Sequence, residues 1–479
     1  MPDQRLNYVG GEWIGSDTNR TFETVNPAAP ETVVATYPQS DGEDTERAIE
    51  AALDATNGWE NTPGPERGQY LTNAGSLLAQ RKDTVTELLV REEGKTWSEA
   101  AGEVQRAIDI FHYYGAKARD IGGTVKGSSA RDTNLYTKRD PLGAVGLITP
   151  WNYPIAIPVW KAAPALAAGN TVVIKPASQA PGVVHEIADI FNEVGVPDGV
   201  FNVVTGSGSE AGDTIVRHPG IEAISFTGST SIGETVYDAA TEGGKRVQLE
   251  MGGKNPTIVS NSADIEEAAN LVAAGAFGVT GQACTACSRA IVHTDVHDDF
   301  LDAIIKRCEA IEPGDGLEDP DMGPHITESE LESTMEYISI GQEEGAVLEA
   351  GGGRPDRDGY FVEPVVFSGV DSNMRIAQEE IFGPVISIIV VDNFEEAITV
   401  ANDVEQGLSA SIVTEDHSEA NRFVEEVEAG VLKINEKTTG LELHVPFGGV
   451  KASSNETYRE QGDAGIDFFT TSRTVYDSY

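Results

Sequence analysis

Cys284 lies in the segment GQACTACSR and is a candidate nucleophile for an electrophilic carbon. A thiol attacks carbon as a thiolate, so it needs a nearby base or a lowered pKa. Glu250, in LEMGGK, stands where a predicted strand runs into glycines, and a carboxylate at such a strand end can act as a general base. The alternatives are that the cysteine only packs and that the carboxylate is an idle surface group.

A third polar group, Asn152, follows a predicted strand within TPWNYPIAIPVWK, residues 149–161. Trp, Asn and prolines together indicate an irregular loop at the carboxyl end of that strand. An amide in this place can donate a hydrogen bond to a developing oxyanion. The loop could also serve packing alone, since tryptophan is usually a core residue.

Two further strand ends carry residues suited to anion binding. Lys175, in KPAS, can reach ribose or phosphate oxygens. The segment FTGSTSIG, residues 226–233, joins a strand to a helix, and its small residues expose backbone N–H groups and the helix N-terminus to an anion. The glycine cluster TGSGSEAG, residues 205–212, lacks the G-x-G-x-x-G spacing and can be a tight turn.

Three cysteines, Cys284, Cys287 and Cys308, are too few for a disulfide framework and suit a reducing compartment. The first two form a C-x-x-C pair. A zinc or redox site would need a second such pair, histidine partners or thioredoxin-like surroundings. We therefore expect no metal.

The chain carries 33 basic and 78 acidic side chains, a formal net charge of −45, and the acidic residues are spread over its whole length. A uniformly acidic surface suits high salt, where self-repulsion is screened, so we expect a halophilic source. The charge argues against nucleic acid, whose partners present basic faces. Because we find no apolar signal core and no apolar run near the roughly 20 residues of a membrane helix, we expect a cytoplasmic protein without membrane contact.

The chain is too long for one hydrophobic core. Residues 40–118 carry apolar residues at helical spacing. From about residue 143, β-rich runs such as AVGLITP and TVVIKPA alternate with helical runs, which indicates βαβ units and a parallel sheet. A second alternating series starts near residue 255, and residues 119–139 and the tail are expected to be strands outside both series.

These segments, in this order, resemble the aldehyde dehydrogenase superfamily over essentially the whole chain, and EEIFGPV (residues 379–385) and PFGG (446–449) complete the pattern. The resemblance implies an α/β fold with a Rossmann-type cofactor domain, an α/β catalytic domain and a small β oligomerisation arm. The expected domains are residues 1–118 and 140–252 for the cofactor, 253–458 for catalysis, and 119–139 with 459–479 for the arm. Strand edges in the arm imply a homodimer or homotetramer.

By the same resemblance, Cys284 attacks the aldehyde carbonyl to give a thiohemiacetal, whose oxyanion is held by the Asn152 side chain and the Cys284 N–H. Hydride leaves for the nicotinamide, a thioester remains, and Glu250 activates the water that hydrolyses it. A second role open to Glu250 is to deprotonate the thiol. Cys287 is expected to pack. A CoA-acylating relative would lack the glutamate, and a non-catalytic homologue would be expected to lose one of these groups, so we disfavour both alternatives.

The resemblance also implies the cofactor residues. Ser229 would bind the pyrophosphate, Lys175 the adenosine ribose and Glu380 the nicotinamide ribose. Ser178 stands where many NAD-preferring members carry a glutamate, and without that charge a 2′-phosphate is not repelled. We therefore expect NADP to be preferred, with NAD possible. The groove would further be lined by Thr149, Pro150, Trp151, Gly228 and Phe382, and Lys161 matches a family lysine near the active site.

The segment KINEKTTGLELHVPFGG resembles the branch that oxidises 2,5-dioxopentanoate to 2-oxoglutarate in pentose and sugar-acid degradation, although residues 436–440 and the GGVKASS ending depart from its commoner form. Succinate semialdehyde and glyceraldehyde are the alternative substrates. An anionic semialdehyde needs a cation in the tunnel, for which Arg106 is our hypothesis and an ordinary surface arginine the alternative. The other candidate substrate residues are Tyr153, Trp160, Thr285, Phe447 and Ser453.

Overall fold

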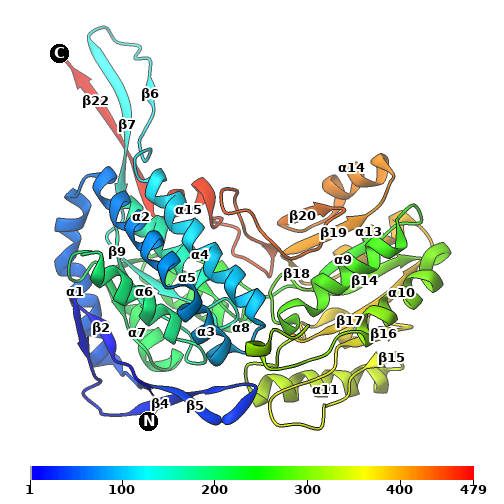
Figure 1. The fold of residues 1–479 in the computed structure, drawn as a ribbon. Coiled ribbons are helices and arrows are strands. Elements are labelled where there is room, and N and C mark those ends of the chain that lie inside the picture. Colours follow the sequence, from blue (N-terminus) through cyan, green and yellow to red (C-terminus); the bar gives the residue numbers. More distant parts are fainter. Residues whose placement is uncertain (1–2) are drawn as a thin grey trace.

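The computed structural model describes residues 3–479, whose two largest sheets have seven strands each, with a slender sheet projecting from the first (Figure 1). The first sheet and its helices come mainly from the blue, cyan and green part of the chain, and the second from the green, yellow and orange part. In the described part of the chain, no helix has both the length and the apolar character needed to cross a membrane.

The first sheet has the order β12-β11-β8-β9-β10-β2-β3, and its strands from β12 to β10 run parallel. From β8 the chain proceeds outward to β9 and β10, then returns to β11 and β12 on the other side. The strand order thus reverses between β8 and β11, which is where such sheets bind ligands. The bounds are β2 (Asn7–Val9), β3 (Glu12–Ile14), β8 (Ala144–Ile148), β9 (Thr171–Lys175), β10 (Phe201–Val203), β11 (Ile221–Thr227) and β12 (Arg246–Glu250).

Helices cover this sheet. Residues 40–118 form the helices predicted there, and capping boxes begin α1, between Asp41 and Asp44, and α4, between Thr96 and Glu99. α3 ends at Gly94, whose φ of +97° favours glycine, so the chain turns sharply into α4. The bounds are α1 (Gly42–Asn61), α2 (Gly64–Gln80), α3 (Lys82–Glu93), α4 (Trp97–Lys117), α5 (Ala156–Ala168), α6 (Gly182–Glu193), α7 (Asp213–Arg217) and α8 (Thr230–Glu242).

The second sheet has the order β15-β16-β17-β14-β13-β19-β20 and is parallel except for β15. Its central strands are buried Val, Ile and Ala runs, as expected for a sheet covered on both faces. The strands are β13 (Asn255–Val259), β14 (Cys287–His293), β15 (Val347–Gly351), β16 (Val365–Ser368), β17 (Val385–Val391), β19 (Ser409–Val413) and β20 (Val431–Ile434). The helices are α9 (Ile265–Phe277), α10 (His297–Glu309), α11 (Glu328–Glu344), α12 (Arg375–Gln378), α13 (Phe394–Asn402) and α14 (His417–Glu426).

The projecting sheet joins β6 (Val125–Lys126), β7 (Thr133–Pro141) and β22 (Thr470–Ser478) and stands clear of both sheets (Figure 1). Strands outside the two alternating series are thus found where the sequence indicates them. The tail differs in one respect. Residues Gly462–Phe468 form α15, which packs on α5 with Ile466 and Phe468 buried in the first core. The burial of these apolar side chains therefore keeps residues 462–468 out of the arm, to which we had assigned residues 459–479.

Short strands complete the chain. A hairpin of β4 (Thr21–Asn26) and β5 (Ala29–Pro38) pairs with β1 (Asp3–Gln4). β18 (Gln406–Gly407) pairs with β21 (Val450–Lys451), which fixes the loop after the second sheet close to the end of β12 through the bridge between Glu250 and Ser454.

Candidate active site

A cleft of about 220 Å³ opens where the strand order of the first sheet reverses. The carboxyl ends of β8, β11 and β12 supply most of its lining, and the loops before β14 and β17 and the start of α11 supply the rest. The cleft therefore lies between the two sheets. It is lined by Pro150, Trp151, Asn152, Thr227, Gly228, Ser229, Met251, Gly252, Cys284, Glu330, Glu380 and Phe382.

Cys284 is partly exposed at this cleft, three residues before β14. Its carbonyl oxygen accepts a hydrogen bond from Asn255 Nδ2 at 2.8 Å, which fixes the backbone of the loop. Burial, together with the negative charges of Glu380 and Glu250, raises the pKa of the Cys284 thiol. The resting thiol is therefore protonated, and its proton must move to a base when it attacks.

Asn152 faces Cys284 from the end of β8. Its Nδ2 donates to the carbonyl oxygen of Gln282 at 2.9 Å, which joins the two loops. Because a primary amide carries two N–H groups, the second can serve a ligand in the cleft that Asn152 lines. An oxygen that gains negative charge beside Cys284 would find a donor here.

Glu250 ends β12 directly before Met251, which lines the cleft. Its Oε2 accepts a hydrogen bond from the Gly449 N–H at 3.1 Å, and within residues 3–479 its Oε1 is buried without a partner. Burial raises the pKa of Glu250, and the nearby carboxylate of Glu460 raises it further. Glu460 itself forms a buried ion pair with Lys161, which also donates to Ser225 at 2.8 Å.

The residues that the sequence predicts to bind a phosphate lie at the ends of β9 and β11. Ser229 precedes α8, and in the described chain its hydroxyl makes no capping hydrogen bond, so it is available to a ligand. Burial lowers the pKa of Lys175 to about 8, and its Nζ donates to the carbonyl oxygen of Pro176 at 2.9 Å. Ser178 donates to the carbonyl oxygen of Gly206 at 3.1 Å. The hydroxyls of Thr149 and Thr227 are also buried near this edge and lack partners among the residues described.

Glu380 and Phe382 reach the cleft from the loop before β17. Glu380 Oε1 accepts from the Gly253 N–H at 3.0 Å, and a Cβ on Gly252 would collide with the same carboxylate. Burial raises the pKa of Glu380 to about 7. Phe382 has a left-handed φ of +59° and meets the ring of Trp151 edge-on, with centroids 5.4 Å apart. A phenylalanine in that conformation is strained, as is common at binding sites.

The predicted substrate residues fall into two groups. Trp160 and Phe447 are buried together, with ring centroids 6.0 Å apart. Near them Arg106 is half-buried on α4 and donates to Gln461 Oε1 at 2.9 Å. Tyr153 lies instead on the other side of Asn152, under Lys95, whose Nζ is 4.6 Å from the ring centroid. Thr285 is buried beside Cys284.

Ser453 and Cys287 are buried and make contacts within the protein only, among the residues described. Ser453 is fully buried, donates to the carbonyl oxygen of Gly252 at 2.6 Å and accepts from the Gly407 N–H at 3.0 Å. With its hydroxyl so occupied it is unavailable to a substrate, which corrects our assignment of Ser453 to the substrate site. Cys287 is buried with its sulfur 3.2 Å from the hydroxyl of Thr257, in agreement with a packing role.

Sequence reasoning missed several residues. Glu330 lines the cleft from α11, whose acidic sequence resembles an ordinary solvated helix. Glu460 and Gln461 belong to a stretch that we had assigned to the arm, so nothing pointed to their burial. Throughout residues 3–479, no group of three or more His, Cys, Asp or Glu side chains is arranged to hold a metal ion.

The fold and the cleft define a class of enzyme in which a cysteine thiol, an amide donor and a buried carboxylate surround the ligand edge of a parallel sheet. A solved structure of betaine aldehyde dehydrogenase from Staphylococcus aureus in complex with NAD⁺ is similar, with a TM-score of 0.96 and 33% identity over 99% of this chain and 95% of that one. The family model described as the aldehyde dehydrogenase family matches residues 13–475. The chain belongs to the aldehyde dehydrogenase family.

Curated relatives narrow the comparison. The chain is 62% identical, over the full length of both proteins, to an α-ketoglutarate semialdehyde dehydrogenase of Haloferax volcanii. It is 46% identical to an α-ketoglutaric semialdehyde dehydrogenase of Bacillus subtilis, over 98% of this chain and 97% of that protein.

Proposed function

We propose that this protein oxidises 2,5-dioxopentanoate (α-ketoglutarate semialdehyde) to 2-oxoglutarate, with NADP preferred over NAD. One observation carries the chemistry: Cys284 and Asn152 line a single cleft, and Glu250 stands directly behind it. The substrate is supported by the full-length likeness to semialdehyde dehydrogenases at 62% and 46% identity.

The reaction starts at Cys284. Its sulfur adds to the aldehyde carbonyl while its proton passes to a base, and the carbonyl oxygen of the resulting thiohemiacetal becomes an oxyanion. The free N–H of the Asn152 side chain and the main-chain N–H of Cys284 stabilise that charge. Loss of hydride from the adduct leaves a thioester on Cys284. One difficult step is thereby divided into two easier ones.

Glu250 completes the cycle. Its unpaired Oε1 takes a proton from water, which attacks the thioester and releases the acid together with the Cys284 thiol. A CoA-acylating enzyme would have no use for this base, so Glu250 favours hydrolysis. Burial holds the pKa of Glu250 high, and the carboxylate of Glu460 raises it further, while Lys161, which pairs with Glu460, works in the opposite direction.

A nicotinamide dinucleotide, when bound, supplies the hydride acceptor. The edge of the first sheet fits such a group: the start of α8 at Ser229 suits pyrophosphate, and Glu380 can accept from ribose hydroxyls. Lys175 and Ser178 lie at the end of β9. Because residue 178 is a serine, it carries no negative charge that would repel a 2′-phosphate. Thr149, Pro150, Trp151, Gly228 and Phe382 line the groove under this proposal.

Arg106 recognises the distal carboxylate of the substrate. Its guanidinium is half-buried and already accompanied by Gln461, whose Nε2 is buried without a partner in the described chain. The indole N–H of Trp160 is likewise buried and has no hydrogen-bond partner among the residues described. These three donors make the proposed anion site at the substrate end, where the carboxylates of Glu442 and Asp109 also act on Arg106. Phe447 packs alongside Trp160, and Tyr153 and Thr285 are placed closer to Cys284.

The wider organisation is proposed on the same basis. Residues 1–118 and 140–252 bind the cofactor, residues 253–458 carry the nucleophile, and the projecting sheet, with open edges, joins a homodimer or homotetramer. The charge of −45 and the likeness to a protein of the halophile Haloferax volcanii support a halophilic source and a cytoplasmic enzyme.

The test is a panel of aldehydes, assayed with NAD and NADP in molar KCl. We expect the highest kcat/KM for 2,5-dioxopentanoate with NADP, and loss of activity in Cys284→Ala but not in the control Cys287→Ala. A clear preference for succinate semialdehyde or glyceraldehyde would overturn the substrate, equal or better efficiency with NAD would overturn the cofactor preference, and an active Cys284→Ala would overturn the mechanism.

A further inference from the structure

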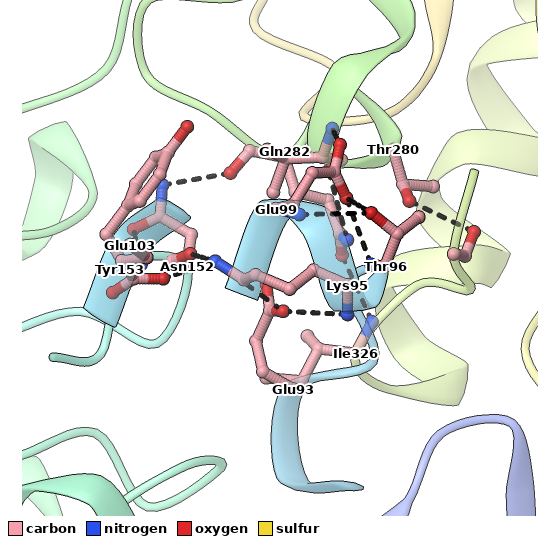
Figure 2. Close-up of polar contacts among 12 residues, drawn as sticks. Glu93, Lys95, Thr96, Glu99, Glu103, Asn152, Tyr153, Thr280, Gln282 and Ile326 are labelled. Atoms are coloured by element: carbon pink, nitrogen blue, oxygen red, sulfur yellow. Dashed lines mark hydrogen bonds and ion pairs between the residues drawn. The ribbon is translucent and has the colours of Figure 1, made fainter. Parts of the chain in front are cut away.

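The residues that begin α4 contact both loops of the cleft (Figure 2). Lys95 Nζ donates to the carbonyl oxygen of Asn152 at 2.7 Å and to Oε2 of Glu103 at 2.6 Å. All three residues are at most 5% exposed. An ion pair shielded from water is thus attached directly to the main chain of the residue that carries the oxyanion donor.

Glu103 holds the same loop further along. Its Oε1 accepts hydrogen bonds from the N–H groups of Ile155 and Ala156, both at 3.0 Å. Between these attachments, the ring of Tyr153 lies under the ammonium group of Lys95. The loop from the end of β8 to the start of α5 is therefore fixed on both sides of Asn152 by the buried pair of Lys95 and Glu103. A second buried carboxylate, that of Glu93, lies 3.7 Å from Lys95 Nζ and completes the charge cluster.

The same part of α4 also reaches the cysteine loop. Glu99 Oε1 accepts from the Val279 N–H at 2.6 Å. Val279 and Thr280 both have left-handed φ values, +52° and +57°, which β-branched residues adopt only when their surroundings impose it. The carbonyl oxygen of Gln282 accepts a hydrogen bond from the Asn152 amide. Its side-chain Oε1 accepts another from the Ile326 N–H at 3.0 Å.

We propose that Lys95 and Glu103 are positioning residues, whose ion pair sets the main chain of Asn152 so that its amide faces the adduct formed at Cys284. This rests on the proposed function, because it requires Asn152 to stabilise the oxyanion. Neither side chain lines the cleft, so the two residues would act through the loop that carries Asn152. A misplacement of about 1 Å at such a donor can lower a rate about a hundred-fold.

A purely structural role is the competing explanation. The ion pair also joins α4 to α5, and a buried pair is by itself weak evidence for stabilisation, since apolar replacements are often neutral. The two explanations differ in their dependence on Asn152. A positioning effect disappears once the Asn152 amide is removed, whereas a structural effect is the same with or without it.

The test is the rate of hydride transfer in a single turnover of the full-length enzyme with 2,5-dioxopentanoate and NADP in molar KCl. Lys95→Met/Glu103→Gln removes both charges of the pair. It also takes the counterion from the buried carboxyl of Glu93, which lies 3.7 Å from Lys95 Nζ. Because burial already raises the pKa of Glu93 to about 8, that carboxyl should then be protonated and uncharged. We expect a loss of about ten- to a hundred-fold in the wild-type background and of less than about threefold in Asn152→Ala. Alkylation of Cys284 by iodoacetamide, which forms no oxyanion, should stay within about threefold of wild type.

Arg91→Met/Glu87→Gln is the matched control, because it removes an ion pair of the same charges on the exposed side of α3. It should leave the rate unchanged. Equal losses in the two backgrounds, or no loss, would overturn the positioning role alone. If Asn152→Ala itself left the rate unchanged, the oxyanion role in the proposed function would fail. Should the double variant not fold, Glu103→Gln, which keeps an acceptor for the α5 N–H groups, carries the same comparison.

Discussion

Oε2 of Glu250 accepts the Gly449 N–H at 3.1 Å, while Oε1 of the same carboxylate is buried without a partner in the part of the chain described. One oxygen is therefore anchored and the other is open. Because burial and Glu460 raise the pKa of Glu250, it holds a proton at pH values where an exposed glutamate is ionised. A base of this kind becomes available only as the pH rises.

Glu250→Gln should separate the two halves of the reaction. Acylation of Cys284 needs no activated water, so a stopped-flow burst of reduced nucleotide should persist, whereas steady-state turnover should fall about a hundred-fold or more. In the wild type, turnover should increase with pH as Glu250 loses its proton. A variant that turns over at the wild-type rate, or a turnover independent of pH, would contradict this role.

Glu380 should make nucleotide binding depend on pH. Its pKa is raised to about 7, and only the ionised carboxylate accepts freely from ribose hydroxyls, so Kd should fall as the pH rises through 7. Glu380→Gln should weaken binding about tenfold and abolish this dependence. Fluorescence titration measures both. The neighbouring Glu379 is paired with Arg375, which lowers the pKa of Glu379, so Glu379→Gln should leave the dependence intact.

The part of the site that follows strand ends could be predicted from the sequence. Asn152, Ser229 and Glu250 come directly after short apolar runs, and parallel strands deliver such residues to one edge. The helices between residues 40 and 118 could also be predicted, because their apolar spacing and the capping preference of residues such as Asp41 are local properties of the sequence.

Residues whose role depends on distant partners could not be predicted. Lys95 and Glu103 look like solvated helix residues, and their burial is decided by the loop around Asn152, more than 40 positions away. Ser453 looked available until Gly252 and Gly407 were seen to occupy its hydroxyl. Local patterns do not record which surface a second element will cover.

Ser178→Glu should reverse the cofactor preference. A carboxylate at this position would repel a 2′-phosphate and accept from a 2′-hydroxyl, so kcat/KM should fall about tenfold or more with NADP and stay equal or rise with NAD. Initial rates with both cofactors check this, preferably at several KCl concentrations because salt weakens repulsion. Ser128→Glu, which adds the same charge in the exposed loop between β6 and β7, should change neither value. An unchanged NADP efficiency in Ser178→Glu would remove this residue from the specificity site.

Arg106→Met and Gln461→Leu should raise KM for acidic semialdehydes much more than they lower kcat. The lost interactions bind the distal carboxylate equally in the ground and transition states, so the cost appears in KM, about tenfold or more for the charged residue and less for the amide. An uncharged aldehyde such as butanal should lose nothing, because it presents no carboxylate to either residue. Arg119→Met removes an exposed arginine two positions beyond the end of α4 and serves as the control. If Arg106→Met changed KM for acidic and uncharged aldehydes alike, the guanidinium would affect the shape of the substrate site and would not bind the carboxylate of the substrate.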